Sequence, residues 1–385
     1  MQSEKCFQYF EELIRKNPDS FLKDFKKIFN QVQQSSAIYD GEPIGFLYQP
    51  MFYDVGDVNL LNNITQKLFN ILDKVVEKYL SSPDFREHFG FSPLMEDLIL
   101  KDPGYGINIP IARFDIFYDC DKIKFCELNT DGTSAMNEAR VLQELFRESL
   151  ILDKMKDRYK FYNYELFQSW IDTVIKNYHH FSPNPKSNPH IAIVDFENEG
   201  TIKEFEEFQK RFINNGFETV ICDPRHLVYK NQTLFYKDLP LDIIYRRATT
   251  ARIVEEAEDI KDFLRAYKEG AVCVIGGFVS QIAHNKIIFS ILHDEEKVSF
   301  LEKEEHDFIK KHIPYTVELN NKNQPIKKEV SQNKDQYILK PCDLYACHGV
   351  YAGRDYSQKE WENILEDIGD ERYIAQEFIE VPSRL

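Results

Sequence analysis

The sequence has no long apolar run, no apolar leader and no low-complexity tract or internal repeat. A membrane-spanning helix needs about 20 consecutive apolar residues, so a membrane protein is not expected. Residues 1–6 lack the apolar region of a secretory signal peptide, which argues against secretion. Proline and glycine are not enriched, with 16 and 15 among 385 residues, so the composition does not indicate a disordered or collagen-like chain.

Paired cysteines and excess positive charge are also missing. An odd number of scattered cysteines fits reduced thiols in a cytoplasmic protein, and no second pair completes a zinc site around Cys342 and Cys347. The formal net charge of −16 argues against binding a nucleic-acid backbone as the main role. It leaves room for a basic nucleotide cleft and weakly favours cationic substrates such as polyamines. The seven cysteines are Cys6, Cys120, Cys126, Cys222, Cys273, Cys342 and Cys347.

The chain has ample apolar material, at 43% hydrophobic residues. Its length predicts two or three domains or one large multilobed enzyme. Apolar residues at helical spacing predict two helices in residues 3–34, separated at Asn17-Pro18. Residues 35–57 read as irregular, and 58–100 as helical with breaks near Ser82-Pro83 and Ser92-Pro93.

The middle of the chain reads as an α/β segment. Residues 190–195 form a short apolar strand, 203–215 an amphipathic helix and 218–222 a second strand. This βαβ pattern predicts a parallel sheet, and it lacks the G-x-G-x-x-G sequence of a dinucleotide site. Further strands are expected at 242–246, 271–275, 337–341 and 372–379, and further helices at 136–150, 164–178, 253–267, 279–292 and 357–367.

Residues 113–129 read as two strands joined by a tight turn at 119–122. Side chains alternate along a strand, so Arg113 and Asp115 share a face, as do Glu127 and Asn129. If Asp115 lies opposite Glu127, then Arg113 lies opposite Asn129. Mg²⁺ takes carboxylate and other oxygen ligands together with substrate phosphates, and an arginine suits developing phosphoryl charge. A solvated hairpin with ordinary cross-strand ion pairs is the alternative.

Four segments, taken in their order, resemble the circularly permuted ATP-grasp enzymes of the glutathionylspermidine synthetase-like group. The order is the specific signal, because the metal motif precedes the Lys-Pro nucleotide motif. The resemblance covers about residue 109 to the C-terminus. The segments are Arg113-Phe-Asp115 with residues 127–134, residues 242–247, Asn285-Lys286, and residues 337–341 running through Gly349-Val350 to residues 375–377.

The resemblance implies an α/β (α+β) chain with an ATP-grasp-like fold, a pre-ATP-grasp parallel βαβ subdomain and a helical N-terminal region. More ATP-grasp structure would be expected beyond Leu385. The implied segments are 1–108, helical; 109–185, a permuted ATP-grasp segment with the metal-site hairpin; 186–276, the pre-ATP-grasp subdomain; and 277–385, the nucleotide-binding segment, expected to be incomplete at its C-terminal end.

The resemblance also assigns roles to residues. Two lysines would contact the ATP phosphates as compact cations, although most lysines in any chain are surface cations. Lys340 lies between apolar neighbours, which favours a buried strand position over that alternative. The implied magnesium ligands are Asp115, Glu127 and Asn129; the implied catalytic residue is Arg113, which would hold the transferred phosphate; and the implied ATP-binding residues are Lys286, Lys340, Gly349, Gln376 and Glu377.

One segment departs from the family pattern. Residues 343–349 keep only Gly349 where several glycines would let backbone N–H groups cover the phosphates. Residues 344–348 are still expected to act as a mobile lid over the nucleotide. The alternative is that Leu344, Tyr345 and Cys347 pack down and close the site permanently.

The function implied is an ATP-dependent carboxylate–amine ligase that uses ATP and Mg²⁺. Its substrates would be small molecules, an amino acid or peptide as the carboxylate and an amine as the acceptor, without nucleic acid or membrane. The alternatives are a catalytically impaired nucleotide-binding protein on the same fold and a scaffold that binds no ATP.

Overall fold

The computed structural model describes residues 2–39, 41–119, 122–319, 324–343, 348–369 and 371–380. The chain divides into two compact units. Unit 1 comprises residues 1–66, 103–110 and 132–276, and unit 2 comprises residues 67–102, 111–131 and 277–385. No helix in the described part of the chain is long and apolar enough to cross a membrane. The division of the sequence into four segments remains a prediction.

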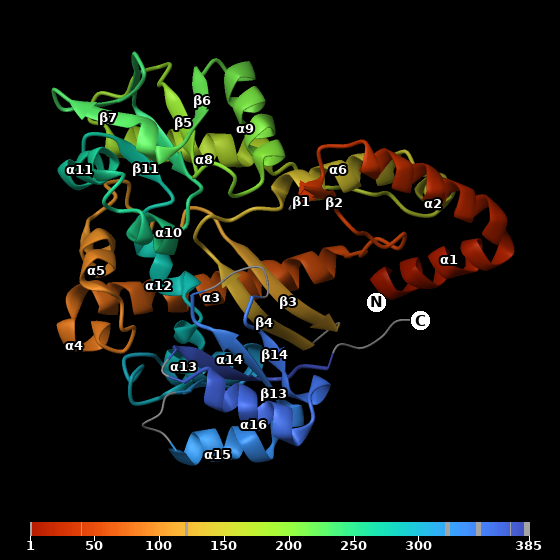
Figure 1. The fold of residues 1–385 in the computed structure, drawn as a ribbon. Coiled ribbons are helices and arrows are strands. Elements are labelled where there is room, and N and C mark those ends of the chain that lie inside the picture. Colours follow the sequence, from red (N-terminus) through yellow and green to blue (C-terminus); the bar gives the residue numbers. More distant parts are fainter. Residues whose placement is uncertain are drawn as a thin grey trace. The chain divides into compact units, whose positions relative to one another are not determined.

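Unit 1 contains the parallel sheet that the βαβ pattern predicts. Its strands run in the order β11-β10-β5-β6, and every neighbouring pair is parallel. All residues of β5, β10 and β11 are buried, as expected for a parallel sheet covered on both faces. Helices α8, α9 and α11 lie around this sheet (Figure 1). The bounds are β5 Ile191–Val194, β6 Thr219–Cys222, β10 Ile243–Arg246, β11 Cys273–Ile275, α8 Phe167–Phe181, α9 Ile202–Asn214 and α11 Lys261–Glu269.

The single helix expected at residues 253–267 is wrong. The structure has α10 (Thr250–Glu255) and, after a turn, α11. The Thr249 side chain caps α10 by accepting from the backbone N–H of Arg252, so that helix begins earlier than expected. Asp262 lies in the first turn of α11, where the helix dipole favours a negative charge.

Unit 1 also has an antiparallel sheet that the sequence did not indicate. It consists of β7 (Leu227–Lys230), β8 (Thr233–Tyr236) and β9 (Leu239–Leu241). Asn231 and Gln232 both take positive φ, 52° and 60°, between β7 and β8. Two consecutive positive φ values are typical of a two-residue hairpin turn.

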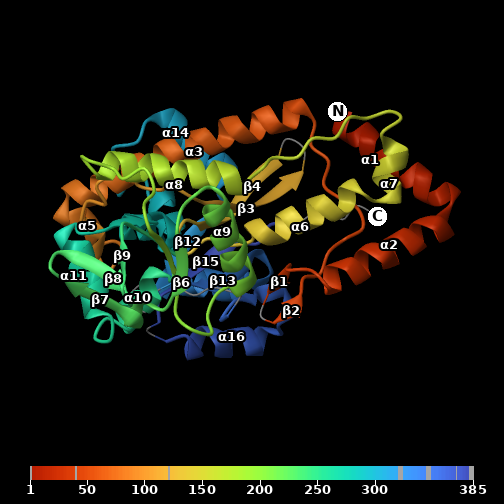
Figure 2. The same ribbon diagram turned by 90° about the horizontal axis from the view of Figure 1, so that it is seen from above.

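The N-terminal helices of unit 1 separate at Asn17-Pro18 as predicted. Their apolar faces share a core with later segments, including Phe10, Phe52, Phe146 and Met155. Figure 2 shows α1, α2, α6 and α7 grouped together, and residue contacts join α2 to α6 and α1 to α7. The bounds are α1 Gln2–Lys16, α2 Pro18–Gln33, β1 Ile38–Tyr39, β2 Glu42–Pro43, α6 Met136–Arg147 and α7 Leu150–Met155. The long helix α3 (Val55–Ser81) begins in unit 1 and ends in unit 2.

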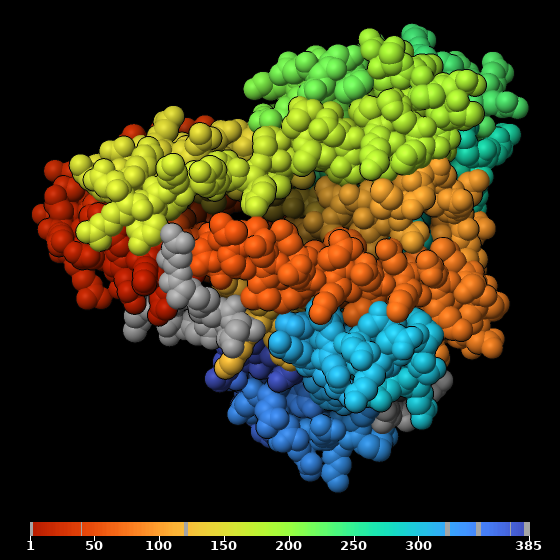
Figure 3. Space-filling model, turned by 180° about the vertical axis from the view of Figure 1, so that it is seen from behind, coloured from red at the N-terminus to blue at the C-terminus, as the bar shows by residue number. Residues whose placement is uncertain are grey.

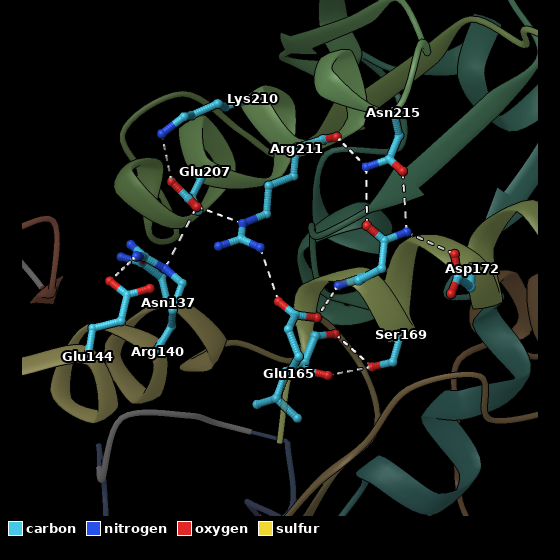
Figure 4. Close-up of polar contacts among 12 residues, drawn as sticks. Asn137, Arg140, Glu144, Glu165, Ser169, Asp172, Glu207, Lys210, Arg211 and Asn215 are labelled. Atoms are coloured by element: carbon cyan, nitrogen blue, oxygen red, sulfur yellow. Dashed lines mark hydrogen bonds and ion pairs between the residues drawn. The ribbon is translucent and has the colours of Figure 1, made fainter. Parts of the chain in front are cut away.

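Charged side chains connect α6, α9 and the segment before α8 in unit 1 (Figure 4). The Arg211 guanidinium contacts Glu207 at 2.7 Å and Glu165 at 3.0 Å. The Nε atom of Arg140 lies 3.7 Å from the Glu207 carboxylate. We call Arg140, Glu165, Glu207 and Arg211 the Glu207 network. Each carboxylate in it faces a guanidinium, so the network is electrostatically balanced.

Unit 2 is built on an antiparallel sheet of order β12-β15-β13-β14. Trp361 and Leu339 belong to a buried cluster that packs α16 against this sheet. Strand β12 and helices α14 and α15 were not expected from the sequence. The bounds are β12 Thr316–Leu319, β13 Tyr337–Pro341, β14 Tyr351–Ala352, β15 Tyr373–Glu377, α14 Lys303–His312, α15 Gln324–Gln332 and α16 Gln358–Asp367.

The helices of unit 2 begin at the breaks that the sequence indicated. The side chains of Ser82 and Ser92 cap α4 (Pro83–Arg86) and α5 (Pro93–Leu100), each accepting a backbone N–H. On the back of unit 2, α3 lies beside the segment that contains α14 (Figure 3), and Lys74 contacts Glu305 there at 2.8 Å.

The single helix expected at residues 279–292 is also wrong. A short 3-10 turn (Phe278–Ser280) leads into α12 (Gln281–His284), and α13 (Ile287–His293) follows separately. Asn285 interrupts the helix with an extended backbone, and its side chain accepts from the backbone N–H of Ile287 at 3.1 Å. The backbone N–H of Lys286 instead donates to the Cys342 carbonyl at 2.9 Å. Lys286 therefore lies at the start of α13, beside the end of β13.

Candidate functional site

The hairpin of β3 (Arg113–Asp119) and β4 (Lys122–Asn129) has the register expected from the sequence. Asp115 pairs with Glu127, and Arg113 pairs with Asn129. A bulge follows Asp115, which bends the strand and leaves this end of the hairpin in a regular ladder. The Arg113 Nε donates to Asp115 Oδ1 at 3.1 Å. Part of the expected turn, residues 120–121, lies outside the described residues.

The two carboxylates of the hairpin have different electrostatic environments. Burial raises the pKa of Asp115, and the nearby Glu127 charge adds to this, while Arg113 opposes it. Burial alone would raise the pKa of Glu127 as well, but Lys286 and Lys340 outweigh it and the pKa is lowered. Lys286 Nζ lies 2.9 Å from Glu127 Oε1. Two adjacent carboxylates repel each other, and a divalent cation between them would remove that repulsion.

Lys340 enters the site from β13. Its Nζ donates to the Cys126 carbonyl at 3.1 Å and to Gln376 Oε1 at 2.8 Å. Gln376 is buried, and its Nε2 donates to Thr316 Oγ1 at 3.1 Å. This line of hydrogen bonds joins β4, β13, β15 and β12. Lys286 and Lys340 thus reach adjacent residues of β4, Glu127 and Cys126.

Glu377 and Gly349, which were also expected to contact the nucleotide, have other contacts in the structure. Glu377 follows Gln376 on β15 but is half-exposed, and its carboxylate accepts from the backbone N–H of Tyr315 at 3.2 Å. Gly349 has φ +69°, and a Cβ there would lie 2.6 Å from the hydroxyl of Tyr373. The left-handed backbone and the nearby Tyr373 hydroxyl both favour glycine at 349, independently of any phosphate. Residues 344–347 of the expected lid lie outside the described residues.

The structure therefore brings most of the expected site residues together within unit 2. Arg113, Asp115 and Asn129 line up on the hairpin with Glu127, and the two lysines reach the same strand. Sequence reasoning missed Thr316, because strand β12 was not recognised. It also missed Gln281 and His284 of α12, although polar residues inside the apolar run of 278–292 were a signal that could have been followed. Asp343, which accepts from the Gln281 amide at 2.8 Å, had no such signal.

The hairpin donors fit a magnesium ion that is shared with a nucleotide. Among the described residues, no group of three or more histidines, cysteines, aspartates and glutamates is placed to hold a metal by itself. Mg²⁺ is commonly bound by one or two carboxylates plus substrate phosphates and water. Asp115, Glu127 and the amide of Asn129 supply that kind of set, with two lysines nearby for phosphate.

Comparisons with known proteins bear on the fold of the chain. No protein-family model matches the chain. A 59-residue stretch is 39% identical to "ATP-grasp enzyme ankG" of Aspergillus thermomutatus, covering 14% of this chain and 12% of that protein. A solved structure of a glutathione synthetase-like effector (GSS30) from Globodera pallida, in the apo form, matches with a TM-score of 0.54 at 12% identity. That match covers 95% of this chain and 83% of the other. The fold is ATP-grasp-like.

These matches support an ATP-grasp-like family at a coarse level. The sequence match spans about an eighth of the curated relative, so that protein's activity does not transfer with it. The structural match, at 12% identity, speaks for the fold alone. The circular permutation expected from the motif order remains a prediction.

Proposed function

We propose that the protein is an ATP-dependent carboxylate–amine ligase that forms an amide through an acyl phosphate, in the manner of the glutathionylspermidine synthetase-like group. One observation carries the proposal. Two carboxylates face each other across the hairpin, Asp115 on β3 and Glu127 on β4, and two lysines also reach β4. Paired carboxylates beside paired ammonium groups suit a magnesium–nucleotide complex, in which both signs of charge are needed.

Each residue has a definite part in this proposal. Asp115, Glu127 and Asn129 would hold Mg²⁺ against the phosphates. The ion pair between Lys286 and Glu127 would be exchanged, so that the lysine faces a phosphate and the carboxylate faces the metal. Lys340 would give up one of its two neutral acceptors for a charged phosphate oxygen, which makes a stronger hydrogen bond.

Arg113 would stabilise the transferred phosphoryl group. Its guanidinium is half-exposed and already held in position by Asp115. A planar guanidinium can bind two phosphate oxygens at once. Gln376 would act indirectly, because it holds the Lys340 ammonium while it is itself held by Thr316. Glu377 and Gly349 would lie where the adenosine and the phosphates are covered.

The proposed reaction has two steps. A carboxylate oxygen of the first substrate attacks the γ-phosphorus of ATP, the bond to the β-phosphate oxygen breaks, and ADP leaves with that electron pair. The amine nitrogen then attacks the acyl carbon, the C–N bond forms and the C–O bond to phosphate breaks. Phosphate leaves with that pair, and the nitrogen releases its proton to phosphate or water. The protein contributes position and charge stabilisation without a covalent intermediate of its own.

Titration calorimetry with ATP and Mg²⁺, followed by ADP release over a panel of amines and amino acids, tests the proposal. Binding together with substrate-stimulated ADP release is the expected result. Binding without stimulated release would favour the second candidate, a catalytically impaired nucleotide-binding protein, which the glycine-poor segment 343–349 motivates. The absence of ATP binding would contradict both.

A further inference from the structure

Beside the candidate magnesium site, α12 holds two buried polar atoms that have no hydrogen-bond partner among the described residues. Gln281 is fully buried, and its Nε2 donates to both carboxylate oxygens of Asp343, at 2.8 and 3.0 Å. Its Oε1 has no partner. The Nδ1 of His284, three residues later, is likewise buried and unpartnered. Asp343 fixes the orientation of the Gln281 amide, so the free oxygen is held in place.

Ten buried side-chain atoms of the described residues lack a hydrogen-bond partner, and these two lie in one turn beside the candidate site. A buried acceptor without a partner costs about 1–3 kcal/mol, and nearly all such groups in folded proteins are satisfied. Residues three apart on a helix lie on the same side, so Gln281 and His284 can serve one ligand. The α12 segment packs against β4, which carries Glu127. The unpartnered atoms therefore lie in the immediate neighbourhood of the candidate active site.

The charges around His284 indicate the chemical class of ligand that would bind there. The carboxylates of Asp131, Asp343 and Glu127 act on the imidazole, and Lys286 opposes them. Asp131 is held by the Ser280 hydroxyl at 3.5 Å. Carboxylates and the Gln281 oxygen are acceptors, and burial favours a neutral imidazole, which offers one acceptor nitrogen. An acceptor-rich cluster with excess negative charge fits a positively charged group that carries several N–H donors.

We propose that Gln281, His284, Asp131 and Asp343 bind the amino group of the second substrate as a primary ammonium. This rests on the proposed ligase function and names the chemical class of its acceptor. An ammonium has three N–H donors. Gln281 Oε1 and His284 Nδ1 accept two of them, and a carboxylate of Asp131 or Asp343 accepts the third. Transfer of one ammonium proton to a neighbouring acceptor of the cluster leaves the neutral primary amine, which is the nucleophile that amide formation requires. The same cluster therefore selects the amine and orients it beside the acyl phosphate.

Binding of simple amines to the full chain, without ATP, tests the pocket directly. The protein is labelled with ¹⁵N-histidine, and the His284 imidazole is assigned among the ten histidines with a His284→Asn variant. The probes are n-propylamine and spermidine. Tetramethylammonium serves as a cation without N–H donors. We expect the His284 resonances to shift with the primary amines and to stay unchanged with tetramethylammonium.

Variants then separate binding from folding, and calorimetry follows amine affinity in each. Gln281→Met and His284→Leu remove one acceptor each with little change in volume and should weaken n-propylamine binding about tenfold or more. His284→Asn places an amide where Nδ1 lies and should stay within about threefold of the wild type. His179→Leu, on the exposed end of α8, is the matched control and should bind the amine as the wild type does.

The outcomes are distinct from those of the ligase proposal. Unchanged amine affinity in both Gln281→Met and His284→Leu, with unchanged thermal midpoints, would overturn the pocket even if ATP still binds. Equal binding of tetramethylammonium, or no response to any primary amine, would overturn it as well. A loss of one bound Mg²⁺ in His284→Leu would assign the cluster to a metal ion and would also overturn it. Failure to bind ATP, by contrast, concerns the proposed function alone.

Discussion

Two groups of charged residues in this molecule look alike in composition and differ in their surroundings. The Glu207 network of unit 1 has two guanidiniums and two carboxylates, and each charge has an opposite partner. Its outer members are open to solvent, with the Glu165 side chain 52% exposed. The hairpin site of unit 2 also pairs carboxylates with cations, but Lys286 is only 5% exposed and unpartnered acceptors lie next to it.

This difference indicates a structural role for the Glu207 network and a ligand-binding role for the hairpin site. Balanced ion pairs that are partly exposed contribute little to stability. In the Glu207 network only the Nε of Arg140 is buried without a hydrogen-bond partner among the described residues, and it lies 3.7 Å from the Glu207 carboxylate. At the hairpin, two half-buried carboxylates repel each other and buried acceptors of α12 lie unsatisfied beside them, which has a free-energy cost that a bound cation or amine removes. Burial of the carboxylates does not distinguish the two regions, since the Glu207 side chain is 13% exposed and the Glu127 side chain 27%. The mutual repulsion of Asp115 and Glu127, with unpartnered acceptors beside them, marks the hairpin as the candidate site.

The strongest test of this contrast removes one hairpin carboxylate. We expect Asp115→Asn or Glu127→Gln to abolish Mg²⁺-dependent ATP turnover while the chain stays folded. Few other negative groups are positioned to hold the metal, so losing one ligand should weaken its binding greatly. The measurement is ADP release against Mg²⁺ concentration, with circular dichroism for the fold.

The matched control is Glu207→Gln, which neutralises an ion-paired carboxylate of unit 1. It should leave turnover within about twofold of the wild type, because it lies outside the proposed site. Wild-type turnover in both hairpin variants would remove Asp115 and Glu127 from the metal assignment.

The next test concerns Lys340. Lys340→Ala should raise the dissociation constant of Mg-ATP about tenfold or more, because losing a charge-assisted hydrogen bond costs about 1.5–3 kcal/mol. Calorimetry measures the change. Lys210→Ala removes an ammonium 4.0 Å from Glu207 and is the control for net charge. If both variants bind the nucleotide equally well, Lys340 does not contact it.

The arrangement of the hairpin residues could be predicted from the sequence, because side chains alternate along a strand and this alternation decides which of them share a face. The register of Asp115 with Glu127 followed from that rule and from the short turn. The contacts of the residues around the two carboxylates could not be predicted from this rule. The Lys286–Cys342 hydrogen bond, which ends one helix and starts another, joins segments 56 residues apart in the chain and has no local signature. The support of Gln376 by Thr316 depends on a strand, β12, whose four residues are too few for a clear period.

The third test concerns Asp195, a buried carboxyl group of unit 1 that we expect to affect stability but not Mg-ATP affinity. Asp195 follows β5, and its Oδ1 accepts from the backbone N–H of Phe196 at 2.9 Å. Burial raises the pKa of Asp195 to about 6, although Arg247 and that hydrogen bond oppose the shift. Between about pH 4 and 6 the folded chain keeps a proton that the unfolded chain has lost. The free energy of unfolding therefore falls as the pH rises through this window.

The matched variant for this effect is Asp195→Asn, which cannot titrate. Relative to it, the wild type should lose on the order of 2 kcal/mol of stability between pH 4 and pH 7, since one pKa unit corresponds to about 1.4 kcal/mol. Urea unfolding of both proteins across this range measures the difference. Parallel pH profiles for the two proteins would show that Asp195 does not titrate in this window. Mg-ATP affinity should stay unchanged in the variant.

The smallest effect is expected in the Glu207 network itself. Glu207→Gln keeps the shape of the side chain and removes its charge, while Arg211 retains Glu165 and its position over the Phe167 ring, 4.6 Å from the centroid. The Glu207 side chain is 13% exposed, but its partners Arg211 and Lys210 are 28% and 69% exposed and reach solvent. Exposed pairs contribute about 0.2–1 kcal/mol, so the variant should lose on the order of 1 kcal/mol. Salt screens such pairs, and the difference in urea midpoint between wild type and variant should shrink in 1 M NaCl. A loss of several kcal/mol that salt does not reduce would mean that Glu207 acts as a buried ion-paired charge. The distinction between the two regions would then rest on the repelling carboxylates of the hairpin and the unpartnered acceptors of α12 alone.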